Sequence, residues 1–222
     1  MSSSKTPSIQ RVCEIMAQLR APDGCPWDRE QDHQTLRYHA VEEVYELIDA
    51  IELEDDHEMR EELGDLLLQV IFHCQLASER QAFDFEEVCE QLAAKLIRRH
   101  PHVFGDQKVK DVAGVWTQWE AIKKEEKAGT ASERHSALDG IPRHLPALHY
   151  AEKLAKKARK LPCLKDSLPS QPLPATPEAF AEALLDQVMS AQQQGWSAEN
   201  LLREALGRRE KKWREQELSA ES

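Results

Sequence analysis

The stretch EEVYELIDAIELEDDHEMREELGD, residues 42–65, combines the spacing of an amphipathic helix with an extreme negative charge. It holds twelve carboxylates and one cation, Arg60, so this segment alone has a formal charge of −11. That value equals the net charge of the whole chain of 222 residues, in which 40 acidic side chains face 29 basic ones. The protein is therefore a neutral chain with one acidic segment.

Helical periodicity in and around this segment predicts the fold. A helix over 35–54 is followed, after a polar break at 55–57, by a second helix over 58–79, and the short break makes them antiparallel neighbours. Similar spacing predicts further helices over 9–20, 86–99, 112–127, 151–160 and 177–218, with a rigid loop at 24–28. Glycine is scarce and β-branched runs are absent, so we expect an all-α antiparallel helical bundle with a C-terminal helical tail.

The apolar positions predict how these helices pack. The helix over 35–54 carries a stripe made of Val41, Val44, Tyr45, Ile48 and Ile51. The segment from Leu63 to Leu76 is apolar nearly all round, so we expect it to be central. In the helix over 86–99, we expect Val88, Leu92 and Leu96 to face inward.

Proline content divides the chain. Five of the eleven prolines lie between Pro162 and Pro177, which predicts a linker or an extended wrap. We expect a helical domain over 1–135, a basic helix with a proline-rich linker over 136–176, and a C-terminal helical segment over 177–222. The last segment weakly repeats the spacing of residues 83–100 at an offset of 113, which either a lost duplication or chance explains.

Composition argues against several classes of protein. The longest apolar run, Leu66 to Phe72, is too short to span a bilayer, and Met1–Gln10 is Ser-rich without the apolar stretch of a secretory signal. Five scattered cysteines without a C-x-x-C pair favour reduced thiols in a cytoplasmic protein. The charge outside residues 42–65 is balanced, so we expect no broad basic surface for nucleic acid.

Four carboxylates converge in the expected hairpin. Glu43 and Glu46 lie three residues apart on the first helix, and Glu62 and Asp65 lie three apart on the second. A solvated acidic face is common on helices and accounts for the first pair taken alone. Asp65 argues against that interpretation, because an aspartate within a run of leucines is costly to bury unless it is paired or metal-bound. Clusters of carboxylates select hard cations, so we expect Mg²⁺, with Mn²⁺ as a possible substitute.

A phosphate group on such a metal also needs cations. Lys95 and Arg99 lie one helical turn apart with Arg98 between them, and Trp119 and Lys123 form a second pair at the same spacing. Each pair alone indicates little, because lysine and arginine are ordinary surface residues. Together with the carboxylates, they describe a site for a metal-bound nucleotide.

These residues resemble a known family. Glu42-Glu43-x-x-Glu46 followed by Glu62-x-x-Asp65 resembles the EExxE…ExxD signature of the MazG family, which consists of all-α nucleoside triphosphate pyrophosphohydrolases. Four further blocks resemble the family in the same order, namely GCPWD at 24–28, EELGDLL at 61–67, RRHPHVF at 98–104 and HSALD at 135–139. The resemblance covers about residues 9–160.

The resemblance implies an activity for the domain over 1–135, the hydrolysis of an NTP or dNTP to the monophosphate and pyrophosphate, and with it a role in cleaning the nucleotide pool. It implies Mg²⁺ held by Glu43, Glu46, Glu62 and Asp65, with Glu42 as an accessory acid. Our hypothesis is that Glu42 or Glu46 is the base. The residues implied in contacts with phosphates and nucleotide are Lys95, Arg99, Trp119 and Lys123, with Trp27 and Asp28 near the base or sugar. Arg98 is a further candidate for binding phosphate, and our hypothesis is that Lys95, Arg99 and Lys123 act on the leaving group. The resemblance also implies a homodimer or a dimer of dimers.

The chain departs from the family pattern after about residue 160. Long family members carry a second EExxE…ExxD copy, whereas residues 177–218 contain no such pairing and 196–213 resemble only its basic helix. We therefore expect one active unit per chain and a degenerate, truncated second repeat. Two alternatives stay open. One is a narrower relative, such as a dUTP, dCTP or phosphoribosyl-ATP hydrolase, and the other is a non-catalytic helical adaptor whose acids form a solvated face.

Overall fold

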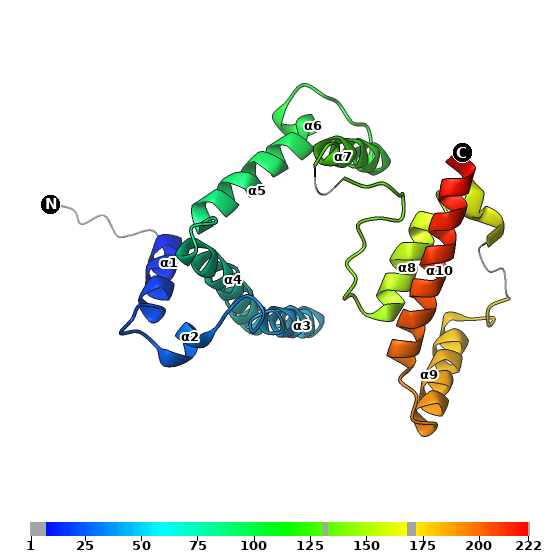
Figure 1. Cartoon of the computed structure of the whole chain (residues 1–222), viewed down its shortest axis with the longest axis horizontal. Coiled ribbons are helices and arrows are strands. Elements are labelled where there is room, and N and C mark those ends of the chain that lie inside the picture. The colour runs from blue at the N-terminus through cyan, green and yellow to red at the C-terminus, as the bar shows by residue number, and fades with distance from the viewer. Residues whose placement is uncertain (1–7, 131–132, 168–171, 222) are drawn as a thin grey trace. The chain divides into compact units, whose positions relative to one another are not determined.

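The computed structural model describes residues 8–130, 133–167 and 172–221. Throughout these ranges the regular elements are helices, which confirms the predicted all-α class (Figure 1). They form two compact units, Met1–Trp119 and Glu120–Ser222, and the boundary between the units falls inside a helix. Residues 1–7 of the Ser-rich start and residues 168–171 of the proline-rich segment lie outside the described ranges.

The first unit follows the predicted order of helices. Its elements are α1 Ser8–Leu19, α2 Pro26–Glu30, α3 His39–Glu52, α4 Asp56–Glu79, α5 Phe85–Arg99, α6 Pro101–Phe104 and the start of α7 Val112–Lys127. The predicted loop at 24–28 is wrong in part, because Pro26 begins α2. Proline suits this position, since the first turn of a helix leaves its N–H groups without partners inside the helix.

Helices α3 and α4 form an antiparallel hairpin and pack on each other more extensively than any other pair (Figure 1). In the turn between them, Glu54 adopts a left-handed backbone with a φ of 55°. The carboxylate of Asp55 then accepts hydrogen bonds from the backbone N–H groups of His57 and Glu58, at 2.9 and 3.2 Å. This N-cap starts α4 at Asp56, two residues before the predicted start. The hairpin sets the acidic parts of both helices side by side.

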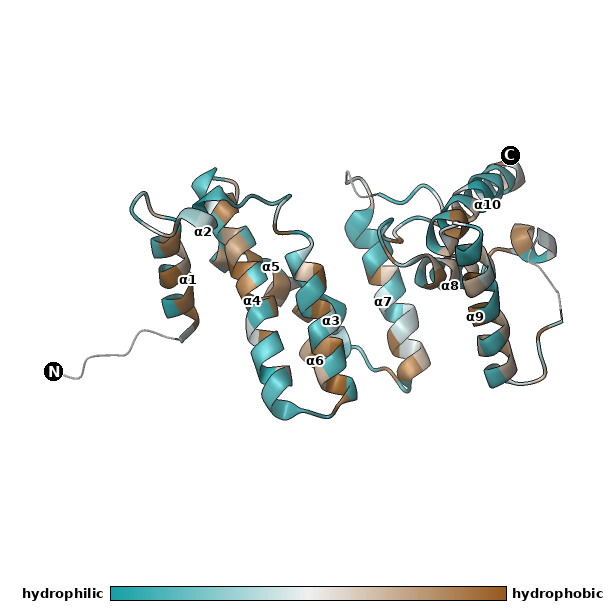
Figure 2. Cartoon of the chain, turned by 90° about the horizontal axis from the view of Figure 1, so that it is seen from below, coloured by the Kyte–Doolittle hydropathy of each residue, from teal (hydrophilic) through white to brown (hydrophobic). Residues whose placement is uncertain are grey.

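The core of the first unit lies at the far end of α4 from this turn. It consists of Met16, Leu36, Ile71, Phe72 and Leu76, which pack together and join α1 to the second half of α4. Figure 2 shows the same division along α4, which is hydrophilic at its start and hydrophobic further along. An ion pair between Arg20 and Glu79, with 2.6 Å between nitrogen and oxygen, also links this end of α4 to the end of α1.

The apolar faces nearer the acids are exposed, which corrects the prediction. Leu63 exposes 50% of its surface, so the first half of α4 is not central in a single chain. Leu92 and Leu96, predicted to face inward, are exposed as well. The α3 stripe is also exposed, and consists of Val41, Val44, Tyr45, Ile48 and Ile51. The physical reason is that, within the described part of this unit, no helix covers these faces.

The second unit has its own core. Its elements after α7 are α8 Ala147–Ala158, the short 3-10 helix η1 Pro162–Ser167, α9 Pro177–Gln193 and α10 Ala198–Glu221. Its buried side chains are Leu138, Leu154, Ala158, Leu164 and Trp213. Leu164 therefore places the start of the predicted linker inside a core. The helix predicted over 177–218 is two helices, with Gly195 at a φ of 72° between them.

Among the described helices, none combines the length and the apolar character that crossing a bilayer requires.

Candidate active site

Three acidic side chains meet between α3 and α4. One carboxylate oxygen from each of Glu43, Glu62 and Asp65 lies within 4.8 Å of the other two, and all three residues are half-buried. The antiparallel hairpin produces this meeting, because the start of α3 lies against the middle of α4. Three of the four predicted metal ligands are thus brought together.

Gln69 supports this group from the next turn of α4. Its side-chain Nε2 donates a hydrogen bond to Glu43 Oε1 at 3.4 Å. Gln69 is itself buried, and its amide oxygen has no hydrogen-bond partner among the described residues. Gln69 lies one turn after Asp65 on the same face of α4, and this spacing is the sequence signal that points to its supporting role.

Burial and neighbouring carboxylates raise the pKa of Glu43 and Glu62. Burial, and then the charges of Asp65 and Glu46, raise the pKa of Glu43 above its ordinary value, although the hydrogen bond from Gln69 opposes this. Burial, followed by the charges of Glu46, Asp65 and Glu43, raises the pKa of Glu62 in the same direction. The group therefore holds more negative charge than its surroundings neutralise.

The two predicted bases occupy different surroundings on α3. Glu46 is exposed, and its charge acts on the pKa of both Glu43 and Glu62, so it borders the carboxylate group. Glu42 instead lies 3.1 Å from Nδ1 of His39 on its own helix. The structure thus associates Glu46 with the carboxylate group and Glu42 with a histidine that the sequence did not single out.

The donor set fits a hard divalent cation. The three ligand atoms of the group are carboxylate oxygens, which Mg²⁺ and Mn²⁺ prefer. A cation among them would also relieve the repulsion that raises the pKa of Glu43 and Glu62. Glu43, Glu62 and Asp65 are therefore the residues able to hold such an ion, with Glu46 at the border.

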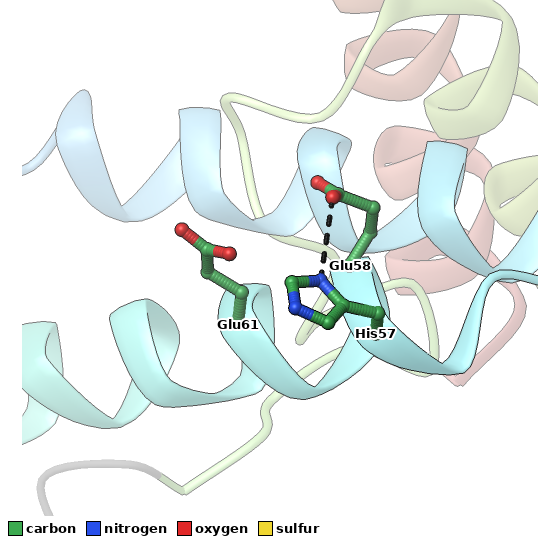
Figure 3. A group of neighbouring side chains, drawn as sticks. All are labelled: His57, Glu58 and Glu61. Carbon is green, nitrogen blue, oxygen red and sulfur yellow. Dashed lines mark ion pairs between the residues drawn. The ribbon is translucent and has the colours of Figure 1, made fainter.

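A second group of potential ligands lies at the start of α4. His57, Glu58 and Glu61 place their ligand atoms within 4.8 Å of one another, and the His57 ring nitrogen lies 3.5 Å from Glu58 (Figure 3). The four-residue spacing of His57 and Glu61 is the sequence signal for this group. All three residues are exposed, so their arrangement has the character of a solvated surface.

One of the predicted phosphate-binding side chains of α5, Arg99, approaches a tryptophan of α7. The guanidinium of Arg99 lies 5.9 Å from the centre of the Trp119 ring, which is the range of a cation–π contact. Trp116 packs edge-on against Trp119, with 5.4 Å between ring centres. On α5, Lys95 lies half-buried one turn before Arg99, and Arg98 is exposed. The end of α5 and the start of α7 therefore form one aromatic and cationic cluster.

Lys123, one turn after Trp119 on α7, belongs to the second unit. Its ammonium lies 3.4 Å from the carboxylate of Glu120.

Trp27 and Asp28 lie on α2. Trp27 is 54% exposed and meets the ring of His39 edge-on, with 6.2 Å between ring centres. The backbone carbonyl of Asp28 accepts a hydrogen bond from Arg20, which holds α2 against the end of α1. Because His39 also contacts Glu42, it connects Trp27 to the start of the acidic helix.

Comparison with known proteins finds relatives for this part of the chain. Residues 31–104, which include the acidic hairpin and α5, match the model of the MazG nucleotide pyrophosphohydrolase domain. The chain is 50% identical over 150 residues to the nucleoside triphosphate pyrophosphohydrolase of Escherichia coli K12, across 67% of this chain and 56% of that relative. It is 45% identical over 153 residues to the nucleoside triphosphate pyrophosphohydrolase/pyrophosphatase MazG of Thermotoga maritima, across 69% of this chain and 57% of that relative.

The chain thus spans little more than half the length of these relatives. A solved structure, that of a MazG-related protein from Thermotoga maritima, aligns with a TM-score of 0.45 and 24% identity, and covers 52% of this chain and 98% of that chain.

Proposed function

Because the chain carries a MazG nucleotide pyrophosphohydrolase domain over residues 31–104, we propose that it hydrolyses nucleoside triphosphates to nucleoside monophosphate and pyrophosphate with the aid of Mg²⁺. The observation that carries the proposal is the meeting of the Glu43, Glu62 and Asp65 carboxylates within 4.8 Å. The names of the two relatives support nucleoside triphosphates as the substrate class. Cleaning of the nucleotide pool is the cellular role that we attach to this activity.

The reaction assigns a task to each acid. Glu43, Glu62 and Asp65 would hold the cation, and Glu46 would complete the set from the border. The chemistry that Mg²⁺ supplies when bound is neutralisation of phosphate charge and a lower pKa for a water. Glu46 accepts a proton from the attacking water, since its charge acts on the group whereas Glu42 faces His39. The water oxygen bonds to the α-phosphorus, the bond from that phosphorus to the bridging oxygen of the β-phosphate breaks, and pyrophosphate leaves.

The cationic residues act on the phosphates in this proposal. Lys95, Arg98 and Arg99 face the charge that develops on pyrophosphate, and Lys123 contributes to the same task. The contact of Arg99 with Trp119 supports a shared role, because an aromatic ring can stack on the base while the guanidinium binds phosphate. Trp27 and Asp28 are assigned to the base or sugar, with the exposure of the Trp27 ring in support.

We also propose that the active form is a homodimer or a dimer of dimers. The α3 stripe and Leu63 of α4 expose apolar side chains on the same two helices that carry the carboxylates. Surfaces of this kind favour association, because burying apolar area contributes roughly 25 cal/mol per Å². A second copy is the fitting partner, since a two-fold axis lets the same stripe meet itself.

A nucleotide panel with pyrophosphate detection tests the activity and its breadth. We expect Mg²⁺-dependent release of pyrophosphate from several NTPs or dNTPs. Turnover of only dUTP, dCTP or phosphoribosyl-ATP would establish the narrower relative. No turnover of any nucleotide, together with no effect of Mg²⁺ on thermal unfolding, would establish the adaptor.

Hydrolysis in ¹⁸O-labelled water tests the position of attack. We expect the label in the monophosphate, because the attacking oxygen stays on the α-phosphorus. Label in pyrophosphate would overturn this position.

A further inference from the structure

A basic cavity lies in the second unit. Its volume is about 650 Å³, and its walls come from the end of α7, the segment 133–137, the end of α8 and α10. Six cations and three carboxylates line it. The cations are Lys123, Lys124, Lys127, Arg134, Lys157 and Lys160. This excess of positive charge occurs in a chain whose net charge is −11.

Two of the three carboxylates are engaged with the backbone. Glu217 is only 6% exposed and accepts hydrogen bonds from the Ser136 hydroxyl and from the Ala137 N–H, at 2.5 and 2.8 Å. Glu133 accepts a hydrogen bond from the N–H of Gly129 at 2.9 Å. These carboxylates therefore brace the loop that forms the wall.

Lys157 lies in the wall of the cavity, and the charged groups around it affect its pKa. Its ammonium is half-buried and donates a hydrogen bond to the carbonyl of Ala137 at 2.8 Å, which fixes its place in the wall. Burial and then the charge of Arg134 lower the pKa of Lys157 below its ordinary value. The charge of Lys160 acts in the same direction, and the carboxylates of Glu120 and Asp139 oppose these effects. Neighbouring cations thus repel one another at this wall, and a bound anion would relieve the repulsion.

We propose that this cavity binds a small polyphosphate anion, the chemical class of inorganic pyrophosphate and of the phosphate chain of a nucleotide. Lysine ammonium groups and the planar guanidinium of Arg134 are the side chains that bind phosphate oxygens best. The concave shape and the volume suit a small ligand rather than the extended backbone of a nucleic acid. Lys123 is the one lining residue that the proposed hydrolysis also uses, and none of the lining acids belongs to the carboxylate group. The cavity variants below therefore change only lining residues that have no part in the proposed hydrolysis.

Calorimetric titration of the full chain with inorganic pyrophosphate in EDTA tests the proposal. The double variant Lys127→Gln/Lys160→Gln removes two lining charges, and we expect its affinity for pyrophosphate to fall at least about tenfold. The single variant Lys124→Gln should give a smaller loss in the same direction. The matched control is Lys153→Gln/Lys156→Gln, whose side chains are exposed on α8 and do not line the cavity. Its affinity should stay within about twofold of the parent chain.

Three outcomes would overturn the proposal. The first is that the parent chain does not bind pyrophosphate. The second is that both double variants weaken binding equally. The third is that a Glu43→Gln/Asp65→Asn chain loses pyrophosphate binding, although these two acids do not line the cavity. A short oligothymidine that binds more tightly per phosphate than pyrophosphate would overturn the choice of a small anion. Titration with ATP in the same buffer shows whether the cavity prefers inorganic pyrophosphate or the phosphate chain of a nucleotide. Equal affinity indicates recognition of the phosphate chain alone, and tighter binding indicates a nucleotide. Loss of hydrolysis leaves each of these results unchanged, since EDTA removes the metal throughout.

Discussion

Asp65 is the residue on which the metal assignment depends most. Its carboxylate lies within 4.8 Å of those of Glu43 and Glu62, and Asp65→Asn removes the charge while keeping the shape. We expect nucleotide turnover to fall by about 100-fold or more, because loss of even an outer-shell partner of a metal costs about 10- to 100-fold. The control is Asp49→Asn, an exposed aspartate of α3 outside the group, which should keep near-normal turnover. Near-normal turnover by Asp65→Asn in pyrophosphate-release assays would contradict the site.

Glu43 makes the stability of the metal-free fold depend on pH. Burial and the charges of Asp65 and Glu46 raise its pKa in the folded chain above the ordinary value of 4.5. The folded state therefore holds this proton more tightly than the unfolded state does. As the pH rises from 4.5 through the raised pKa, the free energy of unfolding falls, and below 4.5 the contribution is constant.

Glu43→Gln should remove the fall in the free energy of unfolding that the Glu43 carboxylate causes as the pH rises. In EDTA at pH 7, we expect the variant to unfold at a higher urea concentration than the parent chain, and at pH 4 the two should unfold together. Saturating Mg²⁺ should make the parent chain the more stable of the two at pH 7. A ligand at 100 times its Kd adds about 2.7 kcal/mol to the free energy of unfolding of the chain that binds it. Glu52→Gln, at the exposed end of α3, is the control. A Glu43→Gln chain that is less stable than its parent in EDTA at pH 7 would show that the Glu43 charge does not destabilise the metal-free fold.

At the scale of elements, the start of α4 decides how the hairpin presents its acids. Asp55 caps this helix through two backbone N–H groups, so Asp55→Ala should lower the free energy of unfolding by about 1 kcal/mol. Asp56→Ala is the matched control, because Asp56 is the first residue of the helix and only its charge near the helix start is lost. Urea unfolding at pH 7 measures both. Equal losses would show that charge at the helix start, rather than the cap, holds the hairpin.

The elements also show why local sequence predicts some features well. Helix α3 and helix α4 were predicted because spacing and capping act between residues a few positions apart, and the short break makes the pair antiparallel. The same local signals do not reveal which helix face meets another helix. Leu63 and Leu92 were therefore misplaced, since their burial requires a surface that this unit does not provide.

At the scale of the whole molecule, the exposed α3 stripe predicts self-association. Ile48 exposes 41% of its surface at the middle of that stripe, and Ile48→Lys would place a charge in the proposed interface. We expect this variant to sediment as a monomer at concentrations where the parent chain is a larger species. Asp49→Lys, the next residue on an exposed polar position, is the control and should associate like the parent. A parent chain that is active and monomeric at low concentration would refute the homodimer.

The sequence by itself determined the helices, the antiparallel hairpin and the pairs of acids three residues apart on each of its helices, because these depend on short spacings along the chain. Only the tertiary structure decided the rest. It hydrogen-bonded Gln69 to Glu43, and packed Leu164 of the predicted linker with Trp213 in one core. It also gathered Arg134 and Lys157 around one cavity. These contacts depend on which distant segments pack against each other, and the spacing of residues along the chain does not determine that packing.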